Sequence, residues 1–240
     1  MTRATQFIVA CVVVLIPTAG QLQAEMIAIT SYDITDAARS GMGGWQHTYS
    51  GSIVDTGNYS ASGLSFTRAN YSGGSGTLND GLEGTGASDT ELFGLKSDVS
   101  PTFTLHLDGF FTISDIALLV VDSANSIPGH IAGFDVTILG ITESFVTSEQ
   151  PTLRDAFVDL TGSSLDGLVT NQIILSNFSH DNLGSFTQVF AIGEIEVQGS
   201  AASVVPLPSS LALLAMGASV TGVGGVFRRR SKKSSKTEAV

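Results

Sequence analysis

The stretch PTFTLHLDGFFTISDIALLVVD, residues 101–122, decides the fold. Residues 101–107 alternate apolar and polar side chains, the pattern of a β-strand that buries one face. Residues 117–121 are apolar throughout, so we expect a central strand there. The pair Asp108-Gly109, an ordinary turn signal, lies between the two runs. The stretch therefore predicts one strand on each side of this pair.

Other short runs rich in β-branched and aromatic residues lie along the chain, bounded by Gly, Asn, Asp, Ser and Pro. They are GLSFT (63–67), GFDVTILG (133–140), NQIILSNF (171–178) and FAIGEIEVQG (190–199). Outside the two ends of the chain, no segment has a long helical period. We therefore predict an all-β fold over residues 26–200, a two-sheet sandwich of the jelly-roll type.

Charge is distributed unevenly over the 240 residues. Residues 25–205 contain four Lys and Arg against 21 Asp and Glu, a net charge of −17. This acidity argues against a nucleic-acid partner, because the nucleic-acid backbone requires a basic surface. It suits a soluble surface, or one that meets calcium ions.

Residues 1–24 are typical of a secretory signal peptide. Arg3 supplies a positive charge, the apolar run at 7–16 is too short to span a bilayer, and Pro17 and small residues follow. We place the cleavage after Ala24; an uncleaved N-terminal anchor is the alternative. The single cysteine, Cys11, lies in this segment. The exported chain would then contain no disulfide, and a core or a bound ion must supply its stability.

The other end of the chain has the pattern of a transmembrane helix. Residues 209–227 are 19 residues without a charge, close to the ~20 needed to cross a hydrocarbon core. A basic cluster that begins with Arg228, Arg229 and Arg230 follows, and it is expected to keep the tail 228–240 in the cytoplasm. The alternative is a buried core helix, which the basic cluster fits badly.

A short proline motif, Val205-Pro206-Leu207-Pro208, lies in the linker at 201–208. Together with the apolar span and the arginine cluster, it resembles the PEP-CTERM sorting signal of exported bacterial proteins. Leu207 stands where that family usually has Glu. The resemblance implies a Gram-negative source, a precursor anchored in the inner membrane, and an exosortase-type membrane protease as a partner. It implies delivery to the cell surface or the extracellular matrix.

The order of segments between the two ends carries a second resemblance. The order is a Leu-Asn-Asp-Gly turn within 75–86, the stretch at 101–122, HIAGFDVTILG at 130–140 and a closing Gly-Glu-Ile-Glu-Val at 193–197. It resembles the galactose-binding-like jelly roll of discoidin domains and many carbohydrate-binding modules.

This second resemblance implies a structural Ca²⁺ ion. Its carboxylate ligands would be Asp80 and Glu194, with main-chain oxygens of Asn79 and Gly81. Calcium prefers six to eight oxygen ligands, which carboxylates on a glycine-containing turn supply. The alternative is an ordinary turn, because Asp-Gly recurs at 108–109 and 166–167 without an obvious need for a metal.

A candidate sugar-binding face lies in GGWQHTYS, residues 43–50. Trp45, His47 and Tyr49 occupy alternate positions, which would share one face of an extended chain. Aromatic rings with polar groups nearby are what a pyranose requires. The alternative is that Trp45 is a core residue of the sandwich.

Catalysis finds little support in the sequence. The four histidines lie in no recognisable motif, and there is no G-x-S-x-G. We therefore expect no enzyme, but an exported non-catalytic β-sandwich that binds an extracellular polysaccharide or matrix polymer. A structural envelope protein without a ligand is one alternative. An extracellular polysaccharide hydrolase that uses a carboxylate pair is the other.

Overall fold

The structure, a computed structural model, describes residues 24–40, 48–83, 90–96, 98–119, 131–149, 156–180 and 188–202. The predicted signal peptide, sorting motif and transmembrane segment lie outside these ranges. Within them, none of the helical segments has the length and apolar character of a membrane span.

The described chain folds into strands and one short 3₁₀ helix, and no α-helix occurs in these ranges. The elements are β1 (Glu25–Ile27), β2 (Ile29–Ser40), β3 (Ser52–Ala61), β4 (Leu64–Gly74), η1 (Thr77–Asn79), β5 (Glu91–Gly94), β6 (Thr102–Leu119), β7 (Ile131–Ile138), β8 (Ile141–Val146), β9 (Ser148–Glu149), β10 (Ala156–Asp159), β11 (Val169–His180), β12 (Val189–Ile192) and β13 (Glu194–Ala201). The all-β prediction is confirmed for the described residues.

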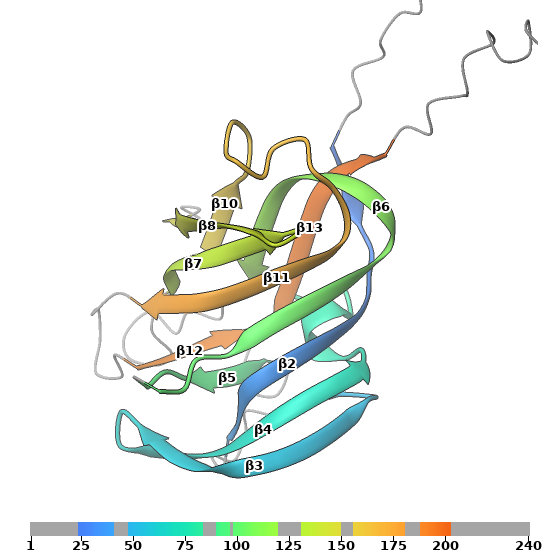
Figure 1. The fold of residues 1–240 in the computed structure, drawn as a ribbon. Helices are drawn as coiled ribbons and strands as arrows, with labels where there is room; N and C mark the ends of the chain where they lie inside the picture. The colour runs from blue at the N-terminus through green and yellow to red at the C-terminus, as the bar shows by residue number, and fades with distance from the viewer. Residues whose placement is uncertain are drawn as a thin grey trace, which may run out of the picture. The chain divides into compact units, whose positions relative to one another are not determined.

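Strand β6 connects the two layers of the sandwich. Its first part, 102–107, lies between β2 and β11 in the order β3-β4-β2-β6-β11-β7-β8. Its second part, 111–119, pairs with β13 on one side, and residues 115–118 pair with β10 on the other. Figure 1 shows β6 rising along one layer, curving over and descending behind it. The described part of the apolar run, residues 117–119, is therefore in a central strand, as predicted, and residues 120–121 lie outside the described ranges.

The stretch at 101–122 forms one strand through Leu119 rather than two separate strands. The ladder explains why the Asp-Gly pair bends this strand without ending it. On the β11 side, Thr170 pairs with Phe111 and Gln172 with His106, so residues 107–110 have only Asn171 opposite them. On the β2 side, the Asp108 amide still donates to the Ala28 carbonyl at 3.3 Å. The hydrogen bond on the β2 side therefore keeps the chain in the sheet at the point where β6 bends.

The core lies between the two layers and is formed by the inward residues of these strands. Phe103 and Leu105 of the first part of β6 and Ile116 and Leu118 of its second part are fully buried. A bulge at Ser114 shifts the alternation between the two parts, because Gln198 pairs with Asp115 while Gly199 pairs with Ile113. Each such side chain contributes roughly 1.5–3 kcal/mol by leaving water. β5 and β12 form a separate two-stranded sheet within this core.

Candidate functional site

The predicted aromatic stretch is only partly described. Trp45 and His47 lie outside the described residues. Tyr49 packs its ring against Tyr71 and Tyr32, with ring centroids 5.1 and 5.2 Å away. Its hydroxyl donates to the Tyr32 carbonyl at 2.7 Å and accepts from the Gly74 amide at 2.8 Å. These contacts hold Tyr49 in the fold, and a ligand role for the three residues stays a prediction.

The turn that carries Asp80 meets Glu194 through its backbone, and a calcium role for the two carboxylates stays a prediction. The Asp80 and Gly81 amides both donate to Glu194 Oε2, at 3.1 and 3.2 Å. Asp80 follows η1, and Gly81 adopts φ +79°, a backbone conformation that favours glycine. Asn79 fixes the turn, because its side-chain amide donates to the Ile29 carbonyl at 2.7 Å and its Oδ1 accepts from the Gly76 amide at 2.8 Å.

The electrostatics of this turn disfavour a charged Glu194. Burial raises the pKa of Glu194 to about 7, and the neighbouring carboxylates of Asp80 and Glu196 add to the rise. The Gly81 and Asp80 amides oppose it. Burial and the carboxylate of Glu83 likewise raise the pKa of Glu196. The neighbouring carboxylates thus repel an ionised Glu194, and a bound cation would relieve that repulsion.

The donor set at this turn fits a calcium ion in part. A cavity of about 210 Å³ is lined by Glu194, Gly81, Asn79 and strand β1 with its neighbours. Asp80 Oδ1 accepts from the Leu82 amide at 2.9 Å. In the described ranges no three acidic, histidine or cysteine side chains converge. Carbonyl oxygens and water would therefore have to complete a shell of six to eight ligands.

A polar row runs along the exposed face of β6, at the positions that alternate with its buried residues. His106 Nε2 contacts Asp33 Oδ2 at 2.9 Å, and the Gly73 amide donates to Asp33 Oδ1 at 2.7 Å. Partial burial alone would raise the pKa of Asp33, but the hydrogen bonds from His106 and Gly73 outweigh it and hold that pKa below its ordinary value. Asp33 therefore stays ionised and orients the His106 ring.

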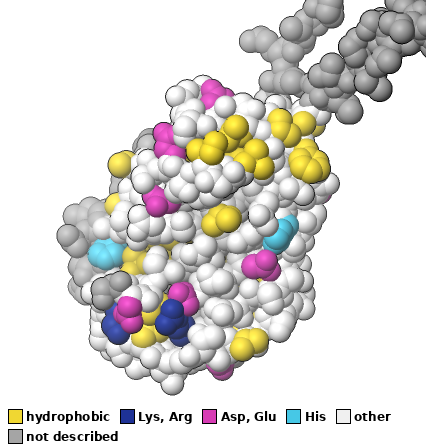
Figure 2. Space-filling model, in the orientation of Figure 1, with side chains coloured by type: hydrophobic (Ala, Val, Ile, Leu, Met, Phe, Trp, Pro, Cys, Tyr) yellow, Lys and Arg dark blue, Asp and Glu magenta, His cyan; other side chains and the backbone are white. Residues whose placement is uncertain are grey.

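Phe110 continues this row at the corner of β6. Its side chain is 62% exposed, and in the described part of the chain it is the one Phe or Tyr among the exposed large hydrophobic residues. Asp108, two positions earlier, is also exposed, as is Asn171, which lies opposite the corner. Figure 2 shows hydrophobic side chains reaching the surface in the upper part of the face it presents.

The corner therefore exposes an aromatic residue, Phe110, on a strand segment that also carries the exposed Asp108 and has the exposed Asn171 opposite it. A ring presents a flat apolar surface, while Asn171 both donates and accepts hydrogen bonds and Asp108 accepts them. This combination suits a polyol that has one apolar face. Sequence reasoning missed Phe110, although the period-2 row of His106 and Asp108 would have placed it on the exposed side.

No known protein-family model matches the chain, and no curated protein matches it. Among solved structures, it is similar to the C-terminal domain of a chitobiase from Bacteroides fragilis, with 17% identity, a TM-score of 0.43, and coverage of 75% of this chain and 100% of that one. It is also similar to the family 32 carbohydrate-binding module of C. perfringens NanJ, solved in complex with galactose. There the identity is 14%, the TM-score is 0.38, and coverage is 73% of this chain and 99% of that one. Scores at this level assign neither a family nor a ligand to this chain.

Proposed function

We propose that this chain is an exported, non-catalytic carbohydrate-binding β-sandwich of the galactose-binding-like type, and that a sugar ring stacks on Phe110. The observation that supports this most is the exposure of Phe110 beside Asp108 and Asn171. An aromatic ring on a strand segment that also carries hydrogen-bonding side chains matches the apolar face and hydroxyls of a pyranose.

The corner is built rigidly enough to select a ligand. The Ala28 carbonyl, next to the start of β2, accepts from the Asp108 amide, and the ladder to β11 resumes directly on both sides of Asn171. The next pair in the row, His106 and Asp33, is locked by the Gly73 amide. Because the strand is paired directly before and after the corner, the site loses little conformational freedom when a ligand binds.

The test is the affinity of the full-length protein for neutral soluble polysaccharides such as dextran, galactomannan and arabinogalactan, measured by affinity electrophoresis. Phe110→Ala is expected to weaken binding about tenfold or more, because truncating an aromatic anchor costs more than 1 kcal/mol. Phe110→Trp should retain binding, because it keeps a flat ring. Val146→Ala is the matched control, since Val146 is 88% exposed on β8.

Three other outcomes would support the alternative hypotheses. Loss of binding in Trp45→Ala but not in Phe110→Ala would move the sugar to the stretch with Trp45, His47 and Tyr49. Unaltered migration with every polysaccharide favours a structural envelope protein. Release of new reducing ends from the polysaccharides favours a hydrolase.

Calcium at the η1 turn is part of the same proposal. Asp80 and Glu194 would hold the ion together with main-chain oxygens of Asn79 and Gly81, and it would stabilise a domain that has no disulfide. The supporting observation is the convergence of the Asp80 turn on the buried Glu194 carboxylate. A calcium-dependent rise in thermal stability that Glu194→Gln removes is the measurement that tests it.

Export and sorting complete the proposal. Residues 1–24 would direct secretion, and 201–240 would present the motif Val205-Pro206-Leu207-Pro208, a membrane span and Arg228–Arg230 to an exosortase-type protease. The support is the order of these parts in the sequence. Cell fractionation with and without the protease tests it, since the protein should accumulate in the inner membrane when the protease is missing.

A further inference from the structure

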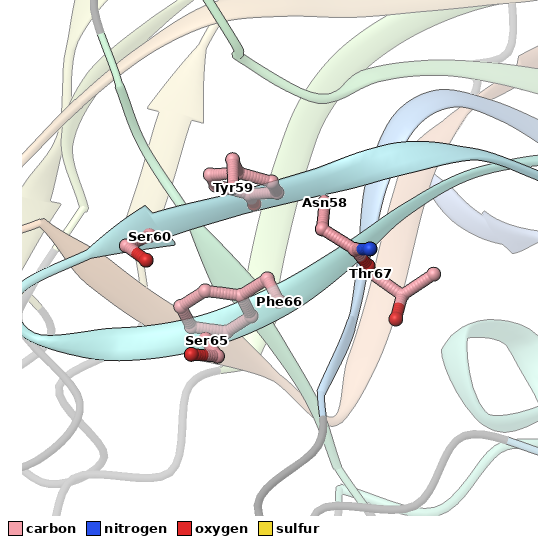
Figure 3. Close-up of a pocket in the computed structure, with 6 residues that line it drawn as sticks. All are labelled: Asn58, Tyr59, Ser60, Ser65, Phe66 and Thr67. Atoms are coloured by element: carbon pink, nitrogen blue, oxygen red, sulfur yellow. The ribbon is translucent and has the colours of Figure 1, made fainter.

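A hollow lies on the hairpin of β3 and β4, at the far end of β2 from the Phe110 corner. Its volume is about 440 Å³, and its lining residues are Asn58, Tyr59, Ser60, Ser65, Phe66 and Thr67. Figure 3 shows these six residues on two neighbouring strands, three from each. The hollow is therefore formed by one hairpin, without a contribution from distant loops.

The lining of the hollow is polar and uncharged. Asn58 pairs with Thr67 and Ser60 with Ser65 across the two strands, so these four side chains share one face of the hairpin. They alternate with Tyr59 and Phe66, which are buried on the other face. One amide and three hydroxyls are thus gathered on one surface, and each of them both donates and accepts hydrogen bonds.

These four side chains differ from the cross-strand polar pairs elsewhere in the sheet. Thr137 and Thr142 lie 2.8 Å apart across β7 and β8, and Ser144 donates to Asp135 at 2.6 Å. In the part of the chain that the structure describes, no hydrogen bond is assigned to the side chain of Asn58, Ser60, Ser65 or Thr67. The hydrogen-bonding capacity of this hairpin face is therefore available to a ligand.

The hairpin that carries the hollow is packed rigidly through its opposite face. The rings of Tyr59 and Phe66 stack at 5.3 Å, and the Tyr59 hydroxyl donates to the Gly94 carbonyl of β5 at 2.8 Å. Burial raises the pKa of Tyr59 above its ordinary value, so this hydroxyl stays protonated and keeps that bond. The polar side chains are thus carried by a strand pair that cannot shift easily.

The charges around the hollow favour a neutral ligand over an anionic one. Arg68, the residue next to Thr67, is engaged by Asp36 through an ion pair of 2.7 Å. Lys96 lies 3.4 Å from Asp98 in the same way. Figure 2 shows the Lys and Arg side chains of this face in contact with acidic ones. No charged side chain lines the hollow itself, and the acidic surface of the domain would repel an anionic polymer.

We infer that the β3–β4 hollow is a second carbohydrate site, which binds a neutral glycan by hydrogen bonds to Asn58, Ser60, Ser65 and Thr67. It is separate from the Phe110 corner, because Phe66 pairs with Ser40 at one end of β2, while the corner hydrogen-bonds Ala28 beside the other end. The 12 residues of β2 would span at most ~40 Å at about 3.3 Å each, and the register shifts along the strand shorten this, so the two sites lie roughly 30 Å apart. The inference shares the ligand class of the proposed function but not its site.

The number of sugar-binding sites per protein molecule tests the inference. Isothermal titration of the full-length protein with neutral oligosaccharides prepared from the polysaccharide that it binds should give two sites. The double variant Asn58→Ala, Thr67→Val should weaken one site about tenfold and leave the other unchanged, and Phe110→Ala should do the converse. Thr142→Val is the matched control, because Thr142 is an exposed hydroxyl on another hairpin. Circular dichroism checks that each variant folds.

The outcomes separate this inference from the proposed function. If Phe110→Ala removes all binding, the hollow is not a sugar site, and the corner remains one. If the double variant removes all binding and Phe110→Ala changes nothing, the hollow is the sugar site and the corner is not. Equal loss with the Thr142 control contradicts a specific role for the hollow.

Discussion

Among the carboxyl groups of the described residues, Glu194 is the one whose titration has the largest expected effect on stability. Its pKa is about 7 in the folded protein against an ordinary value of 4.5, chiefly because the side chain is buried. A folded-state pKa above the unfolded one means that the neutral form is favoured by folding. The corresponding stability is fully present below about pH 4.5 and is lost as pH rises through 7.

We therefore expect the wild-type protein to lose stability between pH 5 and pH 8 by an amount on the order of 3 kcal/mol. Glu194→Gln should show a flatter profile, because glutamine still accepts the Asp80 and Gly81 amides but does not ionise. Calcium at pH 8 should restore stability to the wild type only, since a cation favours the ionised carboxylate. Urea unfolding at pH 5 and pH 8, with and without CaCl₂, measures these changes in the free energy of unfolding.

The matched control for this residue is Glu25→Gln, because Glu25 is exposed on β1. It should keep the wild-type pH profile. Parallel pH profiles of the wild type and Glu194→Gln would contradict the role of Glu194. An equal calcium response in both would place the ion elsewhere.

At the scale of single elements, the strands could be predicted from sequence where one face is buried. Phe103, Leu105 and Leu107 mark β6 by strict alternation, and β7 and β11 follow in the same way. β3 could not be recognised, because it is an edge strand with seven exposed residues before Tyr59. An exposed edge strand lacks the apolar alternation on which such predictions rest.

The course of β6 around its corner could not be predicted either. The local sequence Asp108-Gly109 is typical of a turn, but the hydrogen bond from the Asp108 amide to the Ala28 carbonyl keeps the chain in the sheet. That partner lies about eighty residues earlier in the chain, so no local pattern reveals it. The exposure of Phe110 is a consequence of this corner, which explains why composition and motifs pointed to Trp45 instead.

The sequence order placed the turn with Asp80 near Glu194, while calcium at that turn stays a proposal. Asp80 and Glu194 are 114 residues apart, yet the turn after η1 and the start of β13 meet. The resemblance to a known family predicted this pairing. What it did not predict is that two backbone amides already occupy one oxygen of Glu194.

At the scale of the whole molecule, charge and the placement of the two candidate sites act together. A net charge of −17 over residues 25–205 keeps copies of the domain apart and disfavours acidic polymers. Two neutral-glycan sites roughly 30 Å apart cannot both be filled by one short oligosaccharide, but they can hold two polymer chains. A monomeric domain of this kind would cross-link a polysaccharide without self-association.

Cross-linking is measurable by light scattering of the full-length protein mixed with a neutral polysaccharide that it binds. The apparent mass of the polymer should rise well beyond the added protein mass, pass through a maximum, and fall when excess protein fills every chain separately. Phe110→Ala and the variant Asn58→Ala, Thr67→Val should each still bind but give no such maximum, because one site cannot bridge two chains. A short oligosaccharide of the same sugar should disperse the wild-type complexes. Cross-linking by either single-site variant at the wild-type level would show that the bridges come from contacts between protein copies, and the bivalent arrangement would then be wrong.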